Sequence, residues 1–176
     1  KRSFSHTVPF KRMLVKVKRE IIAGKNPGEL PPAPRLSAHQ LKRWLDEGRP
    51  LTLLDTRNAF EVEVGTFRGA RDLALGNFRE FAEKTSQLRA QALAGPIVTF
   101  CTGGIRCEKA APMLLAQGFQ DVYQLDGGIL EYFQQCGGAH YDGNCFVFDE
   151  RAALTPQLEE AGAATPALAA QHRERL

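Results

Sequence analysis

The 176-residue sequence has no apolar run long enough to cross a bilayer, which takes about 20 residues. No charged-then-apolar leader opens it, so we expect no membrane partner and a cytoplasmic location. Cysteine is scarce: the four residues form no Cys-x-x-Cys pair and are too few for a disulfide scaffold. We therefore expect a reducing compartment and no metal site. Apolar residues still make up 43% of the chain, which is ample for a core.

Positive charge is concentrated at the start of the chain. Residues 1–25 carry a net charge of +7, whereas residues 26–176 carry −4. A basic arm indicates a polyanionic partner, although Lys and Arg also solvate exposed strand faces. Within it, apolar and charged residues alternate over 13–22, which predicts a half-buried strand. Such a strand must pair with a preceding domain or with an edge of the following sheet.

Helix and strand patterns alternate after a linker rich in Pro and Gly, which we place at residues 26–35. The predicted helices are 38–47, capped by Ser37, 78–93, 107–117 and 129–135, and the predicted strands are 51–54, 97–100 and 121–125. This alternation predicts an α/β domain over 36–150, with a parallel sheet covered by helices on both faces. The Ala-rich stretch 151–176 is expected to be a peripheral helix or an extension without chemistry.

Cys101 is the candidate nucleophile, because it directly follows the apolar run 96–100 and precedes a helical pattern. The loop that it opens consists of Cys101, Thr102, Gly103, Gly104, Ile105 and Arg106. A Gly-containing loop between a strand and a helix points backbone N–H groups inward, and the helix N-terminus adds positive charge. Both effects lower the pKa of a thiol from its free value of about 8.5. A buried structural cysteine is the alternative, but two glycines and an arginine fit a site better.

Cys-x-x-x-x-Arg after a strand resembles the active-site loop of rhodanese domains. The resemblance continues upstream over 51–70, where Thr66-Phe67 replaces the usual His-Ile, and downstream over 118–129. It covers about residues 36–136. It implies a rhodanese-like α/β domain with a central parallel sheet flanked by helices. It also implies that Cys101 is catalytic and that Asp55 and Arg57 brace the loops beneath it.

The longer string at 101–110, together with 143–151 and 15–22, resembles the rhodanese-type tRNA uridine hydroxylases. That family implies hydroxylation of the wobble uridine at C5 with molecular oxygen as co-substrate, and no flavin or haem motif is visible. Residues 1–25 would then be the end of an N-terminal ferredoxin-like domain, and the partner would be a tRNA anticodon loop, not DNA. The candidate RNA-binding residues are Lys11, Arg12, Lys16, Lys18 and Arg19.

Other activities fit the generic loop. A sulfurtransferase would load sulfur on Cys101 as a persulfide, and the loop alone supports this equally well. Tyrosine-phosphatase-like enzymes have one more residue between Cys and Arg, and non-catalytic modules usually lack the cysteine. For the hydroxylase, we expect Cys101 to add to C6 of the uracil and so to activate C5.

Two side chains of the loop region have alternative roles, which the sequence leaves open. Arg106 would either hold a substrate anion or tie the loop to an acidic neighbour. Cys107 would either pack in the core, which we favour, or resolve a persulfide or sulfenate on Cys101. The sequence does not determine the oligomeric state.

Overall fold

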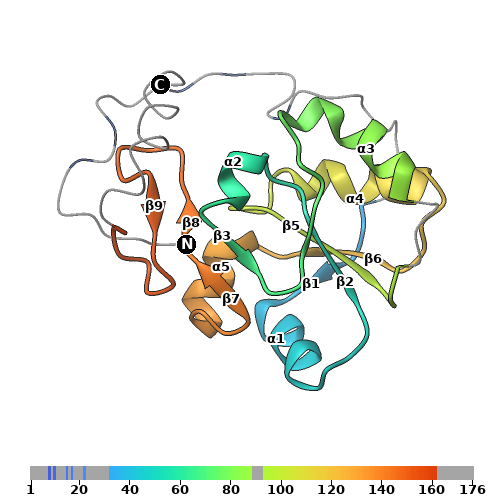
Figure 1. The fold of residues 1–176 in the computed structure, drawn as a ribbon, viewed down its shortest axis with the longest axis horizontal. Helices are drawn as coiled ribbons and strands as arrows, with labels where there is room; N and C mark the ends of the chain where they lie inside the picture. Colours follow the sequence, from blue (N-terminus) through green and yellow to red (C-terminus); the bar gives the residue numbers. More distant parts are fainter. Residues whose placement is uncertain are drawn as a thin grey trace.

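The computed structural model describes residues 32–88 and 93–161 together with Val8, Phe10, Val15, Val17 and Ile22. The predicted strand at 13–22 and most of the basic arm therefore lie outside the described residues. Five parallel strands form the central sheet, in the order β1-β6-β5-β2-β4 (Figure 1). They are β1 (Arg35–Leu36), β2 (Thr52–Asp55), β4 (Arg71–Asp72), β5 (Ile97–Phe100) and β6 (Val122–Leu125).

Helices cover both faces of this sheet, as the alternating sequence pattern predicts. α3 and α4 pack on one face, and α1 and α5 pack on the other (Figure 1). The helices are α1 (Ala38–Asp46), α2 (Ala59–Val62), α3 (Phe81–Leu88), α4 (Cys107–Ala116) and α5 (Gly128–Cys136). In β2, Leu53 joins the core under α1 and α5, and Leu54 joins the core under α3 and α4. Successive side chains of a strand point to opposite faces, so a sheet between two helical layers is apolar throughout.

Local sequence signals explain where the helices begin and end. Ser37 caps α1, since its Oγ accepts a hydrogen bond from the Gln40 N–H at 3.2 Å and the Gln40 side chain accepts from the Ser37 N–H. The helix predicted over 78–93 is shorter and has two parts. A single 3₁₀ turn, η1 (Phe78–Glu80), precedes α3, and residues 89–92 lie outside the described part. No described helix has the length and apolarity to span a membrane.

Two small antiparallel sheets extend the fold beyond the predicted boundaries. β3 (Gly65–Phe67) pairs with β7 (Tyr141–Gly143), and β8 (Cys145–Phe146) pairs with β9 (Ala153–Leu154). Both residues of β9 are buried, so the boundary predicted at residue 150 falls inside the β8–β9 hairpin. Likewise, Arg35 of the predicted linker belongs to β1. Strands of two or three residues carry no measurable period, which is why the sequence pattern missed them.

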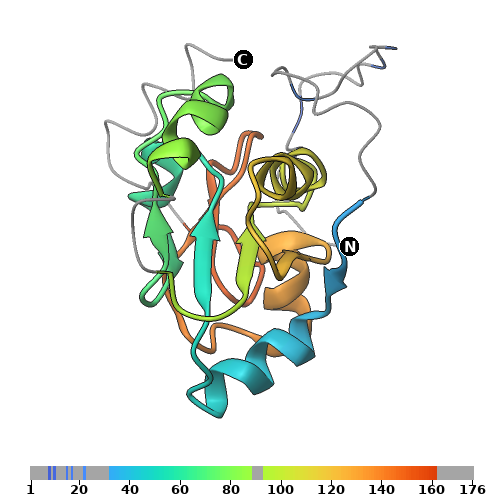
Figure 2. The same ribbon diagram turned by 90° about the vertical axis from the view of Figure 1, so that its right-hand side faces the viewer.

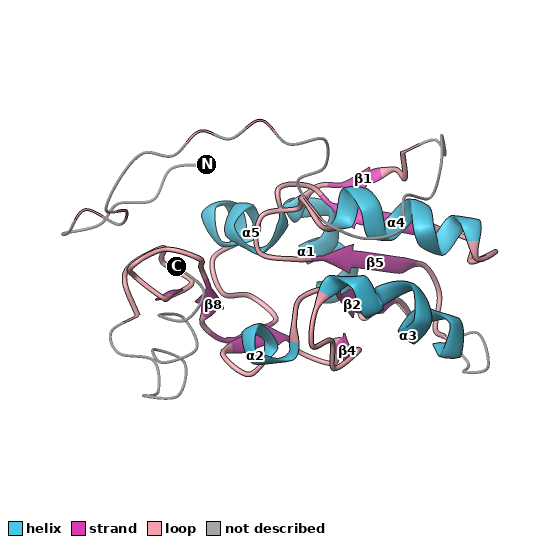
Figure 3. Cartoon of the chain, turned by 90° about the horizontal axis from the view of Figure 1, so that it is seen from above, coloured by secondary structure: helices cyan, strands magenta, loops and turns pink. Residues whose placement is uncertain are grey.

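The direction of the strands fixes where a site can form. β2 and β5 run parallel and in register, and their arrows point the same way in Figure 2. Seen from above, β5 ends on the side of the molecule where α2 and β8 lie (Figure 3). The carboxyl ends of parallel strands are the usual place for ligands in open α/β sheets. Cys101 immediately follows β5 at this edge.

Candidate active site

Cys101 lies at the bottom of a loop whose backbone surrounds its sulfur. Only 2% of the residue is exposed, and the Gly104 N–H donates a hydrogen bond to Cys101 Sγ at 3.1 Å. The first residues of α5 also bind this loop through backbone hydrogen bonds. The backbone N–H groups of Ile129 and Leu130 donate to the carbonyls of Cys101 and Thr102 at 2.9 and 3.1 Å. Strand, loop and helix thus fix the position of the sulfur before any ligand binds.

A glycine is required where α5 approaches the loop. Gly128 has a φ of +68°, in the left-handed region that favours glycine. A Cβ at this position would lie 2.3 Å from the Cys101 carbonyl oxygen and 2.7 Å from the Gly104 nitrogen. Because these contacts involve backbone atoms, they cannot be relieved by turning a side chain. The Gly-Gly turn before α5 is therefore part of the wall that supports Cys101.

The surroundings of Cys101 favour its thiolate. A hydrogen bond from the Cys107 thiol, the positive charge of Arg106 and backbone N–H groups together lower the pKa of Cys101, and they outweigh the opposing effect of burial. Burial and the neighbouring Cys101 raise the pKa of Cys107 well above its ordinary value. Cys101 is therefore the thiolate of this pair, and Cys107 is the protonated donor.

Cys107 lies in the core, which is the alternative that the sequence favoured for it. It is fully buried at the start of α4, and its sulfur lies 3.7 Å from Thr56 Oγ1. Thr56 in turn donates to the carbonyl of Phe100 at 3.0 Å. Cys107 is thus a core residue that also contacts the nucleophile.

Arg106 forms a bidentate ion pair with Glu61 of α2. Arg106 Nη1 and Nη2 lie 2.5 and 2.7 Å from the two carboxylate oxygens, and Glu61 is fully buried. Of the two alternatives from the sequence, the structure shows the tie to an acidic neighbour. The Glu61 carboxylate also accepts from the Asn58 backbone N–H at 3.1 Å and from the Thr102 hydroxyl at 3.4 Å. Glu61 therefore joins α2 to both ends of the Cys101 loop.

Asp55 and Arg57 form a second buried pair, at the end of β2. Arg57 Nη2 lies 2.6 Å from Asp55 Oδ2, and neither side chain is exposed. The same guanidinium donates to the Gly65 carbonyl at 2.7 Å, and Asp55 accepts from the Thr66 hydroxyl at 2.8 Å. The pair links β2 to the start of β3 and does not reach the pocket described next.

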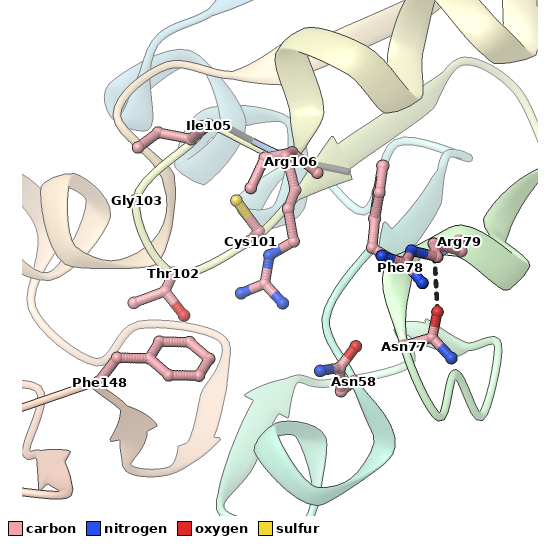
Figure 4. A pocket seen from close by; sticks show the side chains of 11 residues that line it. Asn58, Asn77, Phe78, Arg79, Cys101, Thr102, Gly103, Ile105, Arg106 and Phe148 are labelled. Atoms are coloured by element: carbon pink, nitrogen blue, oxygen red, sulfur yellow. Dashed lines mark hydrogen bonds between the residues drawn. The ribbon is translucent and has the colours of Figure 1, made fainter. Parts of the chain in front are cut away.

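Cys101 opens into a pocket of about 570 Å³, a size typical of small-molecule sites. Its wall combines apolar rings, amides and cations around the sulfur (Figure 4). The lining residues are Ile22, Asn58, Asn77, Phe78, Arg79, Cys101, Thr102, Gly103, Ile105, Arg106 and Phe148. Phe148 and Ile105 are about half exposed at the opening, 48% and 47% respectively, whereas Phe78 is buried. The pocket can therefore accept a flat, partly apolar ligand against the thiolate.

Several residues that line or support the pocket were not predicted from the sequence to belong to the site. Glu61 and Phe148 lie in segments that carried the family resemblance, but their roles depend on the approach of α2 and of the β8–β9 hairpin to the loop. Phe78 and Arg79 fall at the start of the helix predicted over 78–93, and Asn58 lies on a short turn, but none of the three was predicted to be a site residue. Only their placement around Cys101 identifies them.

The remaining predicted residues do not join this site. Lys11, Arg12, Lys16, Lys18 and Arg19, which the sequence suggested as RNA contacts, lie outside the described residues. In the ranges that the structure describes, no group of three or more His, Cys, Asp or Glu side chains is placed to hold a metal ion. Cys136 lies 3.6 Å from a ring nitrogen of His39, and Cys145 is buried in β8, where it pairs with Leu154 of β9.

Comparison with known proteins extends this picture. A family model described as a rhodanese-like domain matches residues 37–135. A tRNA uridine(34) hydroxylase of Paraburkholderia xenovorans is 58% identical over 167 residues, which are 90% of the chain and 58% of that protein. A tRNA uridine(34) hydroxylase of Burkholderia ambifaria is 55% identical over 90% of the chain and 59% of its own length. The chain therefore spans a little under three fifths of the length of these curated relatives.

Solved structures give the same architecture. The solution structure of the rhodanese-like domain of an Anabaena protein superimposes with a TM-score of 0.51 and 26% identity, over 62% of this chain and 79% of that one. A crystal structure of the Anabaena Alr3790 protein also has a TM-score of 0.51, with 22% identity, over 61% of this chain and 91% of that one. The second likeness is one of fold alone.

Proposed function

The chain belongs to the rhodanese-like domain family, and from this premise we propose that it hydroxylates C5 of the wobble uridine of tRNA, with molecular oxygen as co-substrate. The rhodanese fold expected from the sequence is confirmed. The names of the curated relatives support tRNA as the substrate. The four cysteines are all free in the structure, which agrees with the reducing cytoplasm that we propose as its location.

One observation carries the proposal: a cysteine whose thiolate is favoured lies at the bottom of a pocket lined by aromatic rings. The wobble base is in a single-stranded loop, so it can enter a pocket without the opening of a duplex. Phe148 offers an exposed ring at the pocket opening for stacking, which is how proteins commonly bind unpaired bases. Phe148 and Cys101 line the same pocket, so a pyrimidine that enters it can reach the thiolate.

The first step that we propose is nucleophilic addition. The Cys101 thiolate forms a bond to C6, and the C5=C6 electron pair moves toward the O4 carbonyl to give an enolate. The enolate carbon C5 then bonds to molecular oxygen, and a proton completes a hydroperoxide. The Cys107 thiol and the Gly104 N–H stabilise Cys101 as an anion, both before addition and after release.

The remaining steps restore the aromatic base and the enzyme. A thiol reductant supplies two electrons and two protons, which cleave the O–O bond, leave a hydroxyl group on C5 and release water and a disulfide. Loss of the C5 hydrogen as a proton then expels the Cys101 thiolate from C6 and restores the C5=C6 double bond. The sum is one uridine, one O₂ and two thiols converted to 5-hydroxyuridine, water and a disulfide.

The alternative is a sulfurtransferase that carries a persulfide on Cys101. The Gly104 N–H on the sulfur favours this chemistry as well, since backbone amides stabilise a persulfide anion. Two features favour the hydroxylase. Arg106 is already occupied by Glu61 instead of being free for a thiosulfate anion, and the pocket presents Phe78, Ile105 and Phe148 to its ligand.

The test uses the full-length protein with unmodified tRNA, air and a thiol reductant, followed by mass spectrometry of the nucleosides. We expect wild type to add one oxygen to uridine and Cys101→Ser to lose this activity entirely, because serine is a far weaker nucleophile at C6. Cys136→Ser, which removes a thiol at the end of α5, should stay active. Full activity in Cys101→Ser would exclude the covalent step. Thiocyanate formation from thiosulfate and cyanide without any hydroxyuridine would establish the sulfurtransferase instead.

A further inference from the structure

Asn58 places a polar group with an unused acceptor in the pocket wall. The residue is 9% exposed, and within the described part of the chain its Oδ1 is buried without a hydrogen-bond partner. Its backbone N–H is used, because it donates to Glu61. Figure 4 shows the Asn58 side chain reaching into the space bounded by Arg106, Asn77 and Phe148. A buried acceptor without a partner is rare in native structures and calls for an explanation.

The second asparagine of the pocket provides a contrast. Asn77 Oδ1 accepts from the Arg79 N–H at 3.0 Å, and Asn77 Nδ2 donates to Glu80 Oε1 at 2.7 Å. Both ends of this amide are therefore occupied by the cap of η1. Asn77 shapes the wall, whereas Asn58 Oδ1 has no hydrogen-bond partner within the described part of the chain.

The side chains around Asn58 match the two parts of a nucleotide: aromatic rings can bind the base, and a cation can bind the phosphate. Phe148 packs edge-on against Phe146 with ring centroids 5.0 Å apart, so that its face is fixed at the opening of the pocket. Phe78 is held by stacking on Phe81 at 5.3 Å. Arg79 is exposed at the rim, where a cation can reach a phosphate. An aromatic platform, a cation and an amide with a free end together match a flat base that carries a backbone phosphate.

We propose that Asn58 is a specificity-determining residue that binds the Watson–Crick edge of the uracil ring. This inference rests on the proposed function, since it assigns the recognition of the same substrate in the same pocket. Uracil presents an N3–H donor flanked by two carbonyl acceptors. The side-chain amide matches it with Oδ1 accepting from N3–H and Nδ2 donating to the adjacent carbonyl. Oδ1 is buried in the structure, so we infer that the side chain turns about its Cα–Cβ and Cβ–Cγ bonds when uracil binds, which brings both ends of the amide to the base. Bidentate pairing of an asparagine amide with a base edge is an established mode of reading bases.

The test is a binding experiment that does not depend on turnover. The full-length protein is titrated, without oxygen, with a fluorescent anticodon stem-loop RNA that carries either uridine or 3-methyluridine at the wobble position. The methyl group removes the N3–H donor. Wild type is compared with Asn58→Leu, which keeps the branched shape of the side chain and removes the amide, and with Asn77→Leu as a matched control from the same wall. Anisotropy gives the four affinities needed for each coupling cycle.

We expect wild type to bind the uridine RNA roughly tenfold more tightly than the 3-methyluridine RNA, as for one good bidentate contact. In Asn58→Leu, affinity for the uridine RNA should fall roughly tenfold and the preference should shrink to the effect of methyl bulk alone. Asn77→Leu should keep the preference, although loss of the η1 cap should lower its melting temperature. Asn58→Leu removes the N-cap residue of α2, so its melting temperature should fall as well, and circular dichroism of both variants at the assay temperature verifies that they are folded.

Two results would overturn the inference: equal binding of both RNAs by wild type, or a preference that is unchanged in Asn58→Leu. These outcomes are distinct from failure of the proposed function. An Asn58-dependent preference without any hydroxyuridine product would retain the uracil site and reject the hydroxylase. Hydroxyuridine formation together with a preference that does not depend on Asn58 would retain the hydroxylase and reject Asn58 as the uracil-binding residue.

Discussion

Two arginine–carboxylate pairs support this site, and they differ in whether they contact the pocket. Arg57 and Asp55 are both completely buried, and backbone carbonyls and a hydroxyl group complete their hydrogen bonds. Arg106 and Glu61 have equally short contacts, but 11% of the Arg106 side chain is exposed, and Arg106 lines the pocket. The first pair has no contact with the pocket, whereas the second meets it directly.

The two ion pairs therefore differ in their effects on stability and on the chemistry of the Cys101 thiol. A buried pair with satisfied hydrogen bonds mainly fixes geometry, because removal of one partner leaves an uncompensated charge. Arg106 also acts on a neighbour, since its charge is one cause of the lowered pKa of Cys101. We therefore expect damage to the Asp55 pair to appear in stability, and damage to the Glu61 pair to appear in both stability and thiol chemistry.

The largest effect is expected for Asp55→Asn. This change leaves the Arg57 guanidinium buried without its carboxylate and should lower the free energy of unfolding by about 3–5 kcal/mol. Urea denaturation followed by circular dichroism measures this loss. Asp126→Asn is the matched control, because its partner Arg35 is exposed and little change is expected. If the two variants were equally stable, the buried pair would not brace β2.

A smaller loss combined with a chemical effect is expected for Arg106→Met. Glu61 would lose its partner at the cost of about 3 kcal/mol, and the pKa of Cys101 would rise because a positive charge is removed. The measurement combines urea denaturation with the pH dependence of iodoacetamide alkylation at Cys101, located by mass spectrometry. Arg106→Lys keeps the charge and loses the bidentate geometry, so its alkylation profile should stay near that of wild type. Identical profiles for Met and Lys would show that the charge of Arg106 does not act on the thiol.

The contrast between the two pairs also marks what the sequence can predict. The periodic strands at 51–54, 97–100 and 121–125 are close to those observed, and Cys101 was placed at a strand end from local pattern alone. These features depend on burial of whole strand faces, which leaves a regular trace in the sequence. Asp55 and Arg57 were recognised through the family motif.

Glu61 as the partner of Arg106 was not predicted, because 45 residues separate them and neither lies in a periodic element that points to the other. The same holds for Asn58 and Phe148, which reach the pocket from α2 and the β8–β9 hairpin. Short elements are positioned by tertiary contacts and not by their own propensity. The sequence therefore locates the nucleophile, and the structure is needed to identify the wall around it.

Cys107 can be compared with Arg106, since it lowers the pKa of Cys101 by a hydrogen bond and not by a charge. Cys107→Ala should raise the pKa of Cys101, because the donor that favours its thiolate is lost. Cys107→Ser supplies a hydroxyl donor and should shift the alkylation profile less. Loss of packing in the alanine variant should lower stability by about 1 kcal/mol. An alkylation profile that is unchanged in Cys107→Ala would assign the low pKa to Arg106 and the loop amides.

The pH dependence of stability is a further test, in which the contributions of two buried thiols should have opposite signs. The folded pKa of Cys101 is below the unfolded thiol value of about 8.5, so its contribution is complete above that value and is lost as the pH falls through the folded pKa. The stability difference between wild type and Cys101→Ala should thus grow in favour of wild type as the pH rises toward about 8.5. Burial raises the pKa of Cys145 to about 12, so its contribution is complete below the unfolded value and declines as the pH rises beyond it. Urea denaturation of wild type, Cys101→Ala and Cys145→Ala across this range separates the two, because the other titrating groups are common to all three proteins. A Cys101 difference that shrank with rising pH would mean that the folded protein does not favour the thiolate, and the nucleophile would then need activation by its substrate.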